Sequence, residues 1–234
     1  MREIVVIVPT YNNPNTIQDV AQDVLKHGYE LIIIDDGSDI NVENLFIQKE
    51  NIHFVKHMKN VGKGKAIISG VTKAKELGFS YVVSIDGDGQ HLASEIQKLL
   101  TINKQNEIII GARNFELEHV PNGSKFGRWF SNFWACWDTE QEIKDSLSGF
   151  RIYPVSILDL TITTSRFDWE MEVLVRHADS GGIINEVEIE CYYPSAEERV
   201  SHFRKFADTA AIVWVHFRFL PFKWPRFILE KLLG

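Results

Sequence analysis

The chain has 234 residues and a formal net charge of −7, with 44% hydrophobic and 24% charged residues. This composition is that of a globular domain with its own core, which excludes a mainly disordered chain. No run of about 18 apolar residues occurs, so no membrane-spanning helix is predicted. Neither is a signal peptide, because the apolar run after Glu3 is too short. The two cysteines, Cys136 and Cys191, indicate neither a disulfide framework nor a zinc site, and a reducing cytoplasmic location is expected.

Charge is unevenly distributed along the chain. Residues 199–234 carry a net charge of +5 and residues 1–198 a net charge of −12. In this basic C-terminal segment, aromatic residues interleave with Arg218, Lys223 and Arg226. Such a pattern is typical of a peripheral contact with an anionic membrane surface. We expect the segment to lie on the cytoplasmic face of a membrane without crossing it; the alternative is a C-terminal helix folded onto the body of the protein.

The first 113 residues alternate between strand and helix patterns. Apolar runs predict strands at residues 4–8, 31–34, 52–55, 81–85 and 108–110. Amphipathic stretches predict helices over residues 16–26, 62–77 and about 94–100. This alternation is typical of an α/β fold with a parallel, doubly wound sheet, in which ligands bind at the carboxyl ends of the strands.

The pattern changes after residue 113. Residues 115–125 are loop-like, and aromatic residues at helical spacing from Phe126 to Trp137 predict a helix that is either buried in the core or lines a groove for a second substrate. A further helix is predicted over residues 168–178 and a half-exposed strand over residues 183–191. Because this second part lacks a sheet of its own, we expect it to complete the first part as a single domain.

Three polar clusters follow predicted strands: VPTYN (8–12), IDDGSD (34–39) and IDGDGQH (85–91). Parallel strands bring their carboxyl ends to one edge of the sheet, so the aspartates of these clusters should share a cleft. Neighbouring carboxylates repel one another unless a cation is present, and their oxygens suit Mg²⁺ or Mn²⁺. Such a cation can neutralise a leaving diphosphate. These aspartates are Asp35, Asp36, Asp39, Asp86 and Asp88.

Other interpretations of these clusters differ in strength. The cluster at 34–39 by itself could be a β-turn capped by aspartates. The spacing of an EF-hand, a Walker loop or a nicotinamide-type glycine motif is absent. An Asp-x-Asp motif after an apolar strand also resembles the haloacid dehalogenase phosphatases, in which the first Asp is a nucleophile. Their motif continues Asp-x-Asp-Gly-Thr near the start of the chain, whereas here it lies in mid-chain with Gln90 in place of the Thr.

Taken together, several motifs resemble glycosyltransferase family 2 in its GT-A fold. They occur in the order of that family over nearly the whole chain: VPTYN, IDDGSD, residues 60–67, DGDGQH, GAR (111–113), SLSGFR (146–151) and SHFR (201–204). The branch they resemble contains dolichyl-phosphate mannose synthase and bacterial polyprenyl-phosphate glycosyltransferases. The resemblance implies a Rossmann-like, mostly parallel sheet flanked by helices, a nucleotide-sugar donor and inversion at the anomeric carbon. Residues 1–113 would then form the donor half and residues 114–198 the acceptor half.

The resemblance also assigns roles in the donor site. Asp86 would lie near the ribose and diphosphate, with Lys63 and Arg113 as basic residues near the donor. Asp88 and Gln90 would hold the divalent metal, either Mg²⁺ or Mn²⁺. The residues implied to line the nucleoside pocket are Pro9, Tyr11 and Asp36.

The acceptor is expected to be anionic. Arg199, His202 and Arg204 lie within six residues, and arginine is well suited to gripping phosphate. They favour a lipid-linked phosphate acceptor or the donor diphosphate over the alternative, a solvated basic turn. Gly149, where backbone can approach a ligand closely, and Arg151 of the SLSGFR motif are further candidates for acceptor binding. The alternative for Gly149 is a simple turn glycine.

A hydroxyl acceptor, on a lipid or glycan, is the main alternative, and it would need a general base. Asp168, Glu170 and Glu172 are the candidates, of which Asp168 and Glu172 share a helix face; the alternative for Asp168 is a helix cap. A non-catalytic nucleotide-sugar binder and a phosphatase-type hydrolase are remoter alternatives.

The sequence also departs from the family in two places. No Gln-x-x-Arg-Trp motif of processive synthases occurs, and Asn13 stands where the family often has Glu, which removes one expected contact with the nucleotide base. Nothing in the chain predicts binding to nucleic acid.

Overall fold

Seven strands form one sheet in the order β3-β2-β1-β4-β6-β5-β7. The structure, a computed structural model, describes residues 2–102, 105–114, 122–191 and 209–219. Most neighbouring strands are parallel, and only β6 runs antiparallel to both of its neighbours, β4 and β5. The strands are β1 (Arg2–Thr10), β2 (Leu31–Asp35), β3 (Ile52–Lys56), β4 (Phe79–Ser84), β5 (Glu107–Arg113), β6 (Arg151–Pro154) and β7 (Ile183–Ile189).

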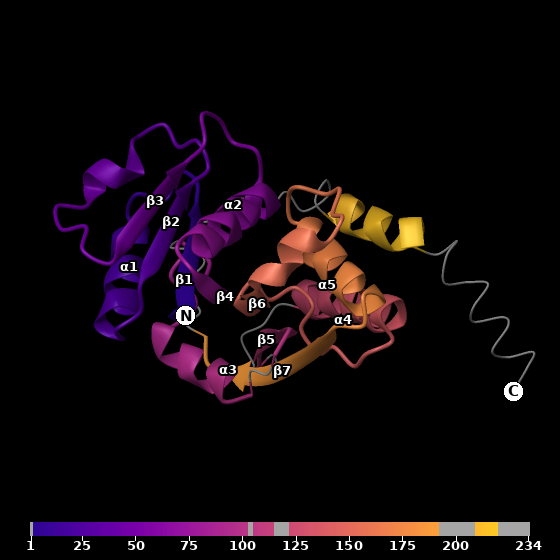
Figure 1. The fold of residues 1–234 in the computed structure, drawn as a ribbon. Helices are drawn as coiled ribbons and strands as arrows, with labels where there is room; N and C mark the ends of the chain where they lie inside the picture. Colours follow the sequence, from indigo (N-terminus) through magenta and orange to yellow (C-terminus); the bar gives the residue numbers. More distant parts are fainter. Residues whose placement is uncertain (1, 103–104, 115–121, 192–208, 220–234) are drawn as a thin grey trace, which may run out of the picture.

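Helices cover both faces of this sheet (Figure 1). One core cluster joins the sheet to α2, α4, α5 and a helix over residues 209–219, and the other joins it to α1 and α3. The single α/β domain predicted from the sequence is therefore confirmed. The helices are α1 (Ile17–Lys26), α2 (Lys63–Glu76), α3 (Ile96–Ile102), α4 (Asn122–Thr139) and α5 (Trp169–Asp179), with short 3₁₀ helices η1 (Val42–Leu45), η2 (Ala93–Glu95) and η3 (Val155–Asp159).

The central strands are apolar along their length because both of their faces are covered. Residues 5–8 of β1 and 31–34 of β2 have no exposed surface. Helices on either side exclude water from such strands, which is why their sequences show continuous apolar runs instead of alternation. The strand β7, at the edge of the sheet, does not show the strict alternation predicted from residues 183–191, because its buried residues Ile184 and Ile189 pack into the two different core clusters.

Strand β6 was not predicted from the sequence. Its four residues are all buried and belong to the SLSGFR motif and the residues directly after it, so they show neither alternation nor a clear apolar run. The strand lies between β4 and β5, which are consecutive in the sequence but not neighbours in the sheet. As a result β5, from the donor half, pairs only with strands of the acceptor half, and residue 113 does not separate two sheets.

Part of the basic C-terminal segment is folded onto the domain. In the helix over residues 209–219, Ile212, Val215 and Phe219 join the core, and Arg218 donates a 2.8 Å hydrogen bond to the hydroxyl of Thr163. This part therefore follows the alternative of a C-terminal helix on the body. Residues 199–208 and 220–234 lie outside the described residues. Within the part of the chain that the structure describes, no helix has the length and apolarity needed to cross a membrane.

Candidate active site

The polar clusters after β1, β2 and β4 meet at one edge of the sheet, as predicted. The backbone N–H of Asp36 donates to the carbonyl of Thr10 at 2.9 Å, and the hydroxyl of Thr16 donates to the carbonyl of Gly87 at 2.6 Å. These contacts join segments that are 26 and 71 residues apart in the sequence. The parallel strands therefore bring the aspartate clusters to one place.

Lys63 lies between two carboxylates at this edge. Its Nζ atom is 2.7 Å from Oδ1 of Asp86 and 3.1 Å from Oε1 of Glu170. Asp86 lies two residues after the end of β4, Lys63 begins α2, and Glu170 lies in the first turn of α5. Burial by itself lowers the pKa of Lys63, but the charges of Asp86 and Glu170 outweigh it and raise the pKa. The lysine is thus held as a cation between the donor and acceptor halves.

Asp88 carries an elevated pKa, although the positive charge of Lys63 acts in the opposite direction. Burial and the negative charge of Asp86 raise its pKa to about 6. The backbone N–H of Gln90 donates to Oδ1 of Asp88 at 3.1 Å, which brings residue 90 next to the carboxylate. A divalent cation would remove the repulsion that raises this pKa. Within the described ranges no group of three or more His, Cys, Asp or Glu side chains has the arrangement of a metal site. The residues present fit Mg²⁺ or Mn²⁺, which bind through one or two carboxylates and complete their shell with water or phosphate oxygens.

Gly149 lies directly against this ion pair. A Cβ atom at this position would be 2.6 Å from Oδ2 of Asp86 and 2.7 Å from Nζ of Lys63. The glycine therefore lets the backbone of the turn before β6 approach the two charged groups. The sequence predicted a close approach of backbone to a ligand here; the structure places the approach at the donor-side residues Asp86 and Lys63.

Arg151 does not fit its expected role in acceptor binding. Its side chain is fully buried, and it donates hydrogen bonds to the carbonyl groups of Ser146, Ser148 and Glu170 at 2.7–2.8 Å. A guanidinium surrounded by backbone carbonyls holds the turn around Gly149 in place and is not available to a substrate. The physical reason is that β6 passes through the sheet interior, so its first residue points into the core.

Asp36 also differs from expectation. Its carboxylate is buried and accepts hydrogen bonds from the backbone N–H groups of Val61 (3.0 Å) and Gly62 (2.9 Å), with a further 2.7 Å hydrogen bond to His57. These partners use the carboxylate to hold the loop that leads into α2, so Asp36 supports this edge of the sheet from inside the fold. Pro9 and Tyr11, at the end of β1, are half-buried there.

Arg113 is fixed by an acidic partner that the sequence analysis did not single out. It donates from Nε to Oδ2 of Asp145 at 2.8 Å and from Nη2 to Oδ1 at 2.9 Å. Asp145 is fully buried, and the positive charge of Arg113 contributes to lowering the pKa of Asp86. Arg113 thus contributes positive charge near Asp86, while its place beside a donor stays a prediction. Asp145 lies directly before the SLSGFR motif, and this position next to a motif was the sequence signal that could have identified Asp145 as a site residue.

The three acids considered as a general base occupy different places from those predicted. Glu172 is fully buried and accepts hydrogen bonds from the backbone of Thr163 and Thr164 at 3.1 and 2.9 Å. Burial by itself raises the pKa of Glu172, but these hydrogen bonds and the charge of nearby Arg176 outweigh it, and the pKa is lowered. A buried, hydrogen-bonded carboxylate with a lowered pKa is unsuited to the role of general base. Glu172 therefore stabilises the fold.

The other two candidate acids, Asp168 and Glu170, also differ from expectation. Asp168 is the residue that precedes the helix, and its Oδ1 accepts a 3.0 Å hydrogen bond from the backbone of Arg166 without capping the helix through its side chain. Glu170, which was expected to point elsewhere, is the acid that reaches the site through Lys63. Helix α5 packs against α2, and Glu170 reaches Lys63 at the start of α2, whereas Glu172 points to Thr163 and Thr164.

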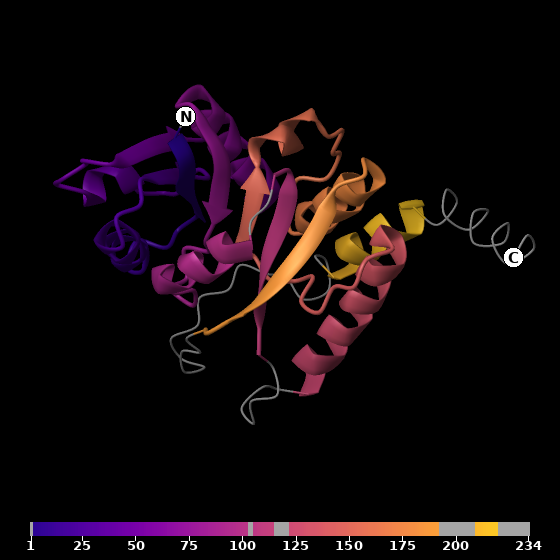
Figure 2. The same cartoon turned by 60° about the horizontal axis from the view of Figure 1, so that its bottom comes forward.

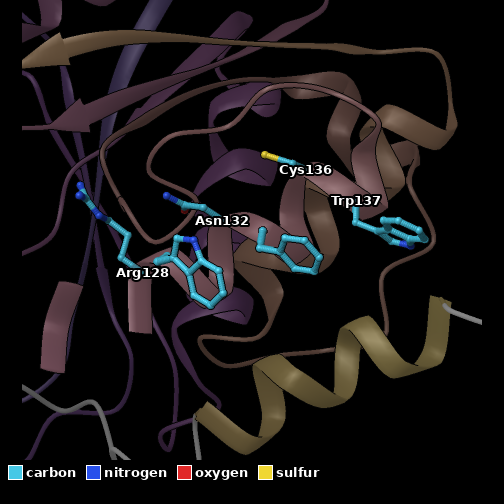
Figure 3. A pocket seen from close by; sticks show the side chains of 6 residues that line it. Arg128, Asn132, Cys136 and Trp137 are labelled. Atoms are coloured by element: carbon cyan, nitrogen blue, oxygen red, sulfur yellow. The ribbon is translucent and has the colours of Figure 1, made fainter. Parts of the chain in front are cut away.

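A hollow of about 550 Å³ lies along α4, the helix for which the sequence analysis left open both a core position and a groove-lining one (Figure 3). Arg128 and Asn132 give it polar groups, and aromatic rings form most of its wall. The side chain of Asn132 accepts hydrogen bonds from the backbone and the hydroxyl of Ser146, three residues before Gly149. One turn thus connects the hollow with Asp86. The residues that line the hollow are Arg128, Trp129, Asn132, Phe133, Cys136 and Trp137.

Three of the predicted acceptor residues cannot be placed. Arg199, His202 and Arg204 lie outside the described residues. The chain leading to them is anchored at the site by His91, the last residue of the DGDGQH motif. His91 is nearly buried, stacks on Phe150 with ring centroids 5.2 Å apart, and forms a β-bridge with Cys191. Burial lowers the pKa of His91 to about 4, so the imidazole is neutral at pH 7 and has a packing role.

Comparisons with known proteins agree with this geometry. The sequence model of glycosyl transferase family 2 matches residues 5–153, which is more than half of the chain. The chain is 29% identical over 215 residues to UDP-N-acetylglucosamine–dolichyl-phosphate N-acetylglucosaminyltransferase of Methanococcus voltae, covering 81% of this chain and 86% of the relative. It is 24% identical over 201 residues to undecaprenyl-phosphate mannosyltransferase of Micrococcus luteus, covering 80% and 82%.

A solved structure shows the same fold. Glucosyl-3-phosphoglycerate synthase of Mycobacterium tuberculosis superposes with a TM-score of 0.71 at 17% identity, over 92% of this chain and 78% of that protein. The match of the family model extends from β1 to β6 and contains Lys63, Asp86, Asp88 and Gly149. It favours glycosyl transfer over the phosphatase interpretation of the Asp-x-Asp motif. The chain therefore belongs to glycosyl transferase family 2 and is a glycosyltransferase with the GT-A fold.

Proposed function

We propose that the protein transfers a sugar from a nucleotide-diphosphate sugar, a UDP-sugar or GDP-sugar, to a lipid-linked phosphate, with inversion and with a divalent metal. The observation that carries this proposal is the hollow on α4, where Arg128 and Asn132 lie among aromatic rings and connect through Ser146 to the acidic edge. The cationic side chain of Arg128 suits a phosphate group, and the rings suit the first carbons of an apolar chain. The amide of Asn132 is already hydrogen-bonded to Ser146 and to the carbonyl of Lys144, so it holds the turn at the side of the hollow. The names of the Methanococcus and Micrococcus relatives, which act on dolichyl and undecaprenyl phosphate, support this acceptor class.

The donor would bind at the carboxyl ends of β1, β2 and β4. Asp88 and Gln90 would hold Mg²⁺ or Mn²⁺, and the bound metal would supply the positive charge that stabilises the leaving diphosphate. The M. tuberculosis structure, which contains Mn²⁺ and uridine diphosphate, supports this assignment. Pro9 and Tyr11 would line the nucleoside pocket, with Asp36 holding the loop behind it.

The residues of this chain would orient the reaction from both sides. Lys63, held between Asp86 and Glu170, and Arg113, held by Asp145, would keep positive charge next to the diphosphate. An oxygen of the acceptor phosphate would attack the anomeric carbon from the side opposite the donor diphosphate. The new carbon–oxygen bond forms as the bond to the β-phosphate breaks, and the nucleoside diphosphate leaves with the bonding electrons.

This reaction needs no general base. A phosphate monoester has its second pKa near 6, so it is already mostly a dianion at pH 7. The burial of Glu172 supports this acceptor over a hydroxyl, because that acid is removed from the set of candidate bases. Arg199, His202 and Arg204 would help to hold the phosphate, in addition to Arg128. The enzyme would then work at a membrane surface on the cytoplasmic side.

Two linked measurements test the function. A thermal-shift panel of nucleoside diphosphates and nucleotide sugars with Mn²⁺ or Mg²⁺ identifies the donor, because a ligand at 100 times its Kd adds about 2.7 kcal/mol to the free energy of unfolding. Sugar transfer from that donor is then compared on a short-chain polyprenyl phosphate and on the matching polyprenol. Transfer to the phosphate alone is expected. Transfer to the polyprenol alone would establish a hydroxyl acceptor, and metal-dependent binding without transfer to any acceptor would indicate a sugar-nucleotide binder.

A further inference from the structure

Exposed aromatic side chains are concentrated on one part of the surface. Among the described residues, the exposed large aromatic side chains are Trp129 (61% exposed), Phe133 (51%), Trp214 (65%) and Phe217 (52%). All of them lie on α4 or on the helix over residues 209–219. Exposed aliphatic side chains occur elsewhere, for example Ile47 after η1. The exposed aromatic side chains therefore lie together on two helices, whereas exposed aliphatic side chains such as Ile47 occur elsewhere.

The aromatic rings form a continuous strip across two helices. The ring of Trp129 lies 6.2 Å from that of Phe133, Phe133 lies 5.6 Å from Trp134, and Trp134 lies 6.3 Å from Phe217. Trp214 is three residues before Phe217 on the same helix and so shares its face. We call the five residues Trp129, Phe133, Trp134, Trp214 and Phe217 the aromatic strip. In both views α4 and the helix over 209–219 lie together at one end of the molecule, opposite β3 (Figures 1 and 2).

The strip is held rigidly on the domain. His216 forms a buried hydrogen bond with Asp138 of α4, and the guanidinium of Arg176 lies 4.9 Å from the ring centre of Phe219. The helix over 209–219 therefore turns Ile212 and Val215 inward and leaves Trp214 and Phe217 outward. Exposing two large rings from a helix that is otherwise well anchored costs solvation free energy, which indicates that something covers them.

The geometry points to an anionic lipid bilayer as the occupant of this strip. Tryptophan rings prefer the headgroup region of a bilayer, where an apolar body and a polar N–H are both satisfied. The strip also leads directly into residues 220–234, where Lys223, Arg226 and Lys231 outnumber Glu230, and such positive charge complements anionic headgroups.

This surface would also determine how the acceptor reaches the site. Trp129 and Phe133 belong both to the strip and to the wall of the hollow on α4, so the hollow opens within the proposed membrane contact. A lipid-linked phosphate could then enter the hollow while its chain remains in the bilayer. This inference rests on the proposed function in taking the acceptor to be lipid-linked, but the membrane contact itself can be measured without any turnover.

Co-sedimentation of the full chain with vesicles tests the membrane contact. The vesicles are made of phosphatidylcholine with or without 30% phosphatidylglycerol. A Trp214→Asp, Phe217→Asp double variant should lose at least tenfold in affinity for the anionic vesicles. An Ile47→Asp, Met58→Asp variant is the matched control, because these residues are 100% and 97% exposed and lie near β3. The control should bind like the unchanged protein. An unchanged thermal shift with nucleoside diphosphate and Mn²⁺ shows that both variants are folded.

Two alternative explanations would give different results: membrane contact through the C-terminal residues alone, and a strip covered by a second copy of the chain. If the C-terminal residues alone make the contact, Lys223→Gln, Arg226→Gln, Lys231→Gln will abolish vesicle binding while the strip variant retains it. If a second copy of the chain covers the strip, the strip variant will change the mass in light scattering and not the vesicle affinity. Either result overturns the inference. Loss of vesicle binding together with unchanged transfer to a soluble short-chain acceptor supports it, whereas failure of transfer in the unchanged protein would contradict the proposed function instead.

Discussion

Gly149 is in direct contact with Asp86: a Cβ at residue 149 would lie 2.6 Å from Oδ2 of that carboxylate. It would also lie 2.7 Å from Nζ of Lys63, which is paired with the same carboxylate. The residues after 113 thus reach the candidate donor site through the backbone of Gly149, with no side chain in between. The contact explains why a glycine precedes β6 at a position where its own φ angle is not in the left-handed region.

Gly149→Ala should separate Lys63 from Asp86 and weaken donor binding at least tenfold, a loss of about 1.4 kcal/mol. Because both contacted atoms are the ends of side chains, the fold should survive. Gly127→Ala, in α4, is the control, since a Cβ there meets no atom within 4 Å. Calorimetric titration with nucleoside diphosphate and Mn²⁺ measures the difference, and equal affinities of the two variants would show that the contact does not matter for donor binding.

Metal binding should depend on pH through Asp88. Its pKa is raised to about 6, so the carboxylate is charged above pH 6 and protonated below it. Affinity for Mn²⁺ and nucleoside diphosphate should therefore be constant near pH 7.5 and fall up to tenfold for each pH unit below 6. Titrations between pH 5 and 7.5 measure this profile, and Asp88→Asn should remove the metal-dependent binding. A profile that is flat through pH 6 would contradict the assignment of the metal to Asp88.

The same raised pKa predicts an effect on stability without metal. Asp88 binds its proton more tightly in the folded protein than in the unfolded chain, so its ionisation destabilises the fold as pH rises from about 4 to 6 and above. At pH 7.5 Asp88→Asn should therefore raise the free energy of unfolding by about 1–3 kcal/mol. Asp159→Asn, at the exposed last residue of η3, should change the free energy of unfolding little. Urea unfolding in the presence of a chelator gives the values, and a destabilised Asp88→Asn protein would be inconsistent with the repulsion from Asp86.

Glu172→Gln should lower stability without removing catalysis. The buried carboxylate accepts hydrogen bonds from the backbone of Thr163 and Thr164, and weakening them should cost about 1–3 kcal/mol. Because the pKa of Glu172 is lowered in the folded state, this difference should be full at pH 7 and disappear as the pH falls through that lowered pKa. Glu76→Gln, on the surface of α2, is the matched control. Urea denaturation at pH 7 and at a pH below the lowered pKa of Glu172 tests the change in stability. Turnover at pH 7 tests whether catalysis remains.

A general base would reveal itself among the same acids. Changing Asp168, Glu170 or Glu172 to its amide, one at a time, should leave turnover per folded molecule within about tenfold. A loss of about 10²–10⁴-fold from one of these changes is the size expected for removal of a general base. That result would make a hydroxyl the acceptor and overturn the proposal of a phosphate.

Arg128→Ala should raise the KM for a polyprenyl phosphate while nucleotide binding remains unchanged. The arginine lines the hollow on α4, and none of the residues that line this hollow belongs to β1 or β2. Arg199→Ala and Arg204→Ala are expected to act in the same direction. Lys144→Ala, whose side chain is 73% exposed, is the matched loss of one positive charge. Steady-state transfer assays with varied acceptor concentration measure the KM of each variant. If Lys144→Ala raised the KM as much as Arg128→Ala, the effect would come from the overall charge of the protein and not from a contact between Arg128 and the acceptor.

The sequence by itself determined the α/β class and the meeting of the three polar clusters. Continuous apolar runs require burial on both faces, and parallel strands carry their carboxyl ends to one edge, so residues 8–12, 34–39 and 85–91 had to converge. The identity of Asp88 and Lys63 as candidates also followed from local motifs. These conclusions depend on short-range patterns, which are visible in a single sequence.

Only the tertiary structure decided which polar groups are open to a substrate. Arg151, Asp36 and Glu172 looked like site residues, but hydrogen bonds to backbone groups of other segments hold each of them as a buried support. The partners lie up to 26 residues away in the sequence, and no local pattern specifies such hydrogen bonds. Likewise, the exposure of Phe133 in an aromatic helix depends on where the helix over 209–219 packs, because the same helical spacing fits a buried face or an open one.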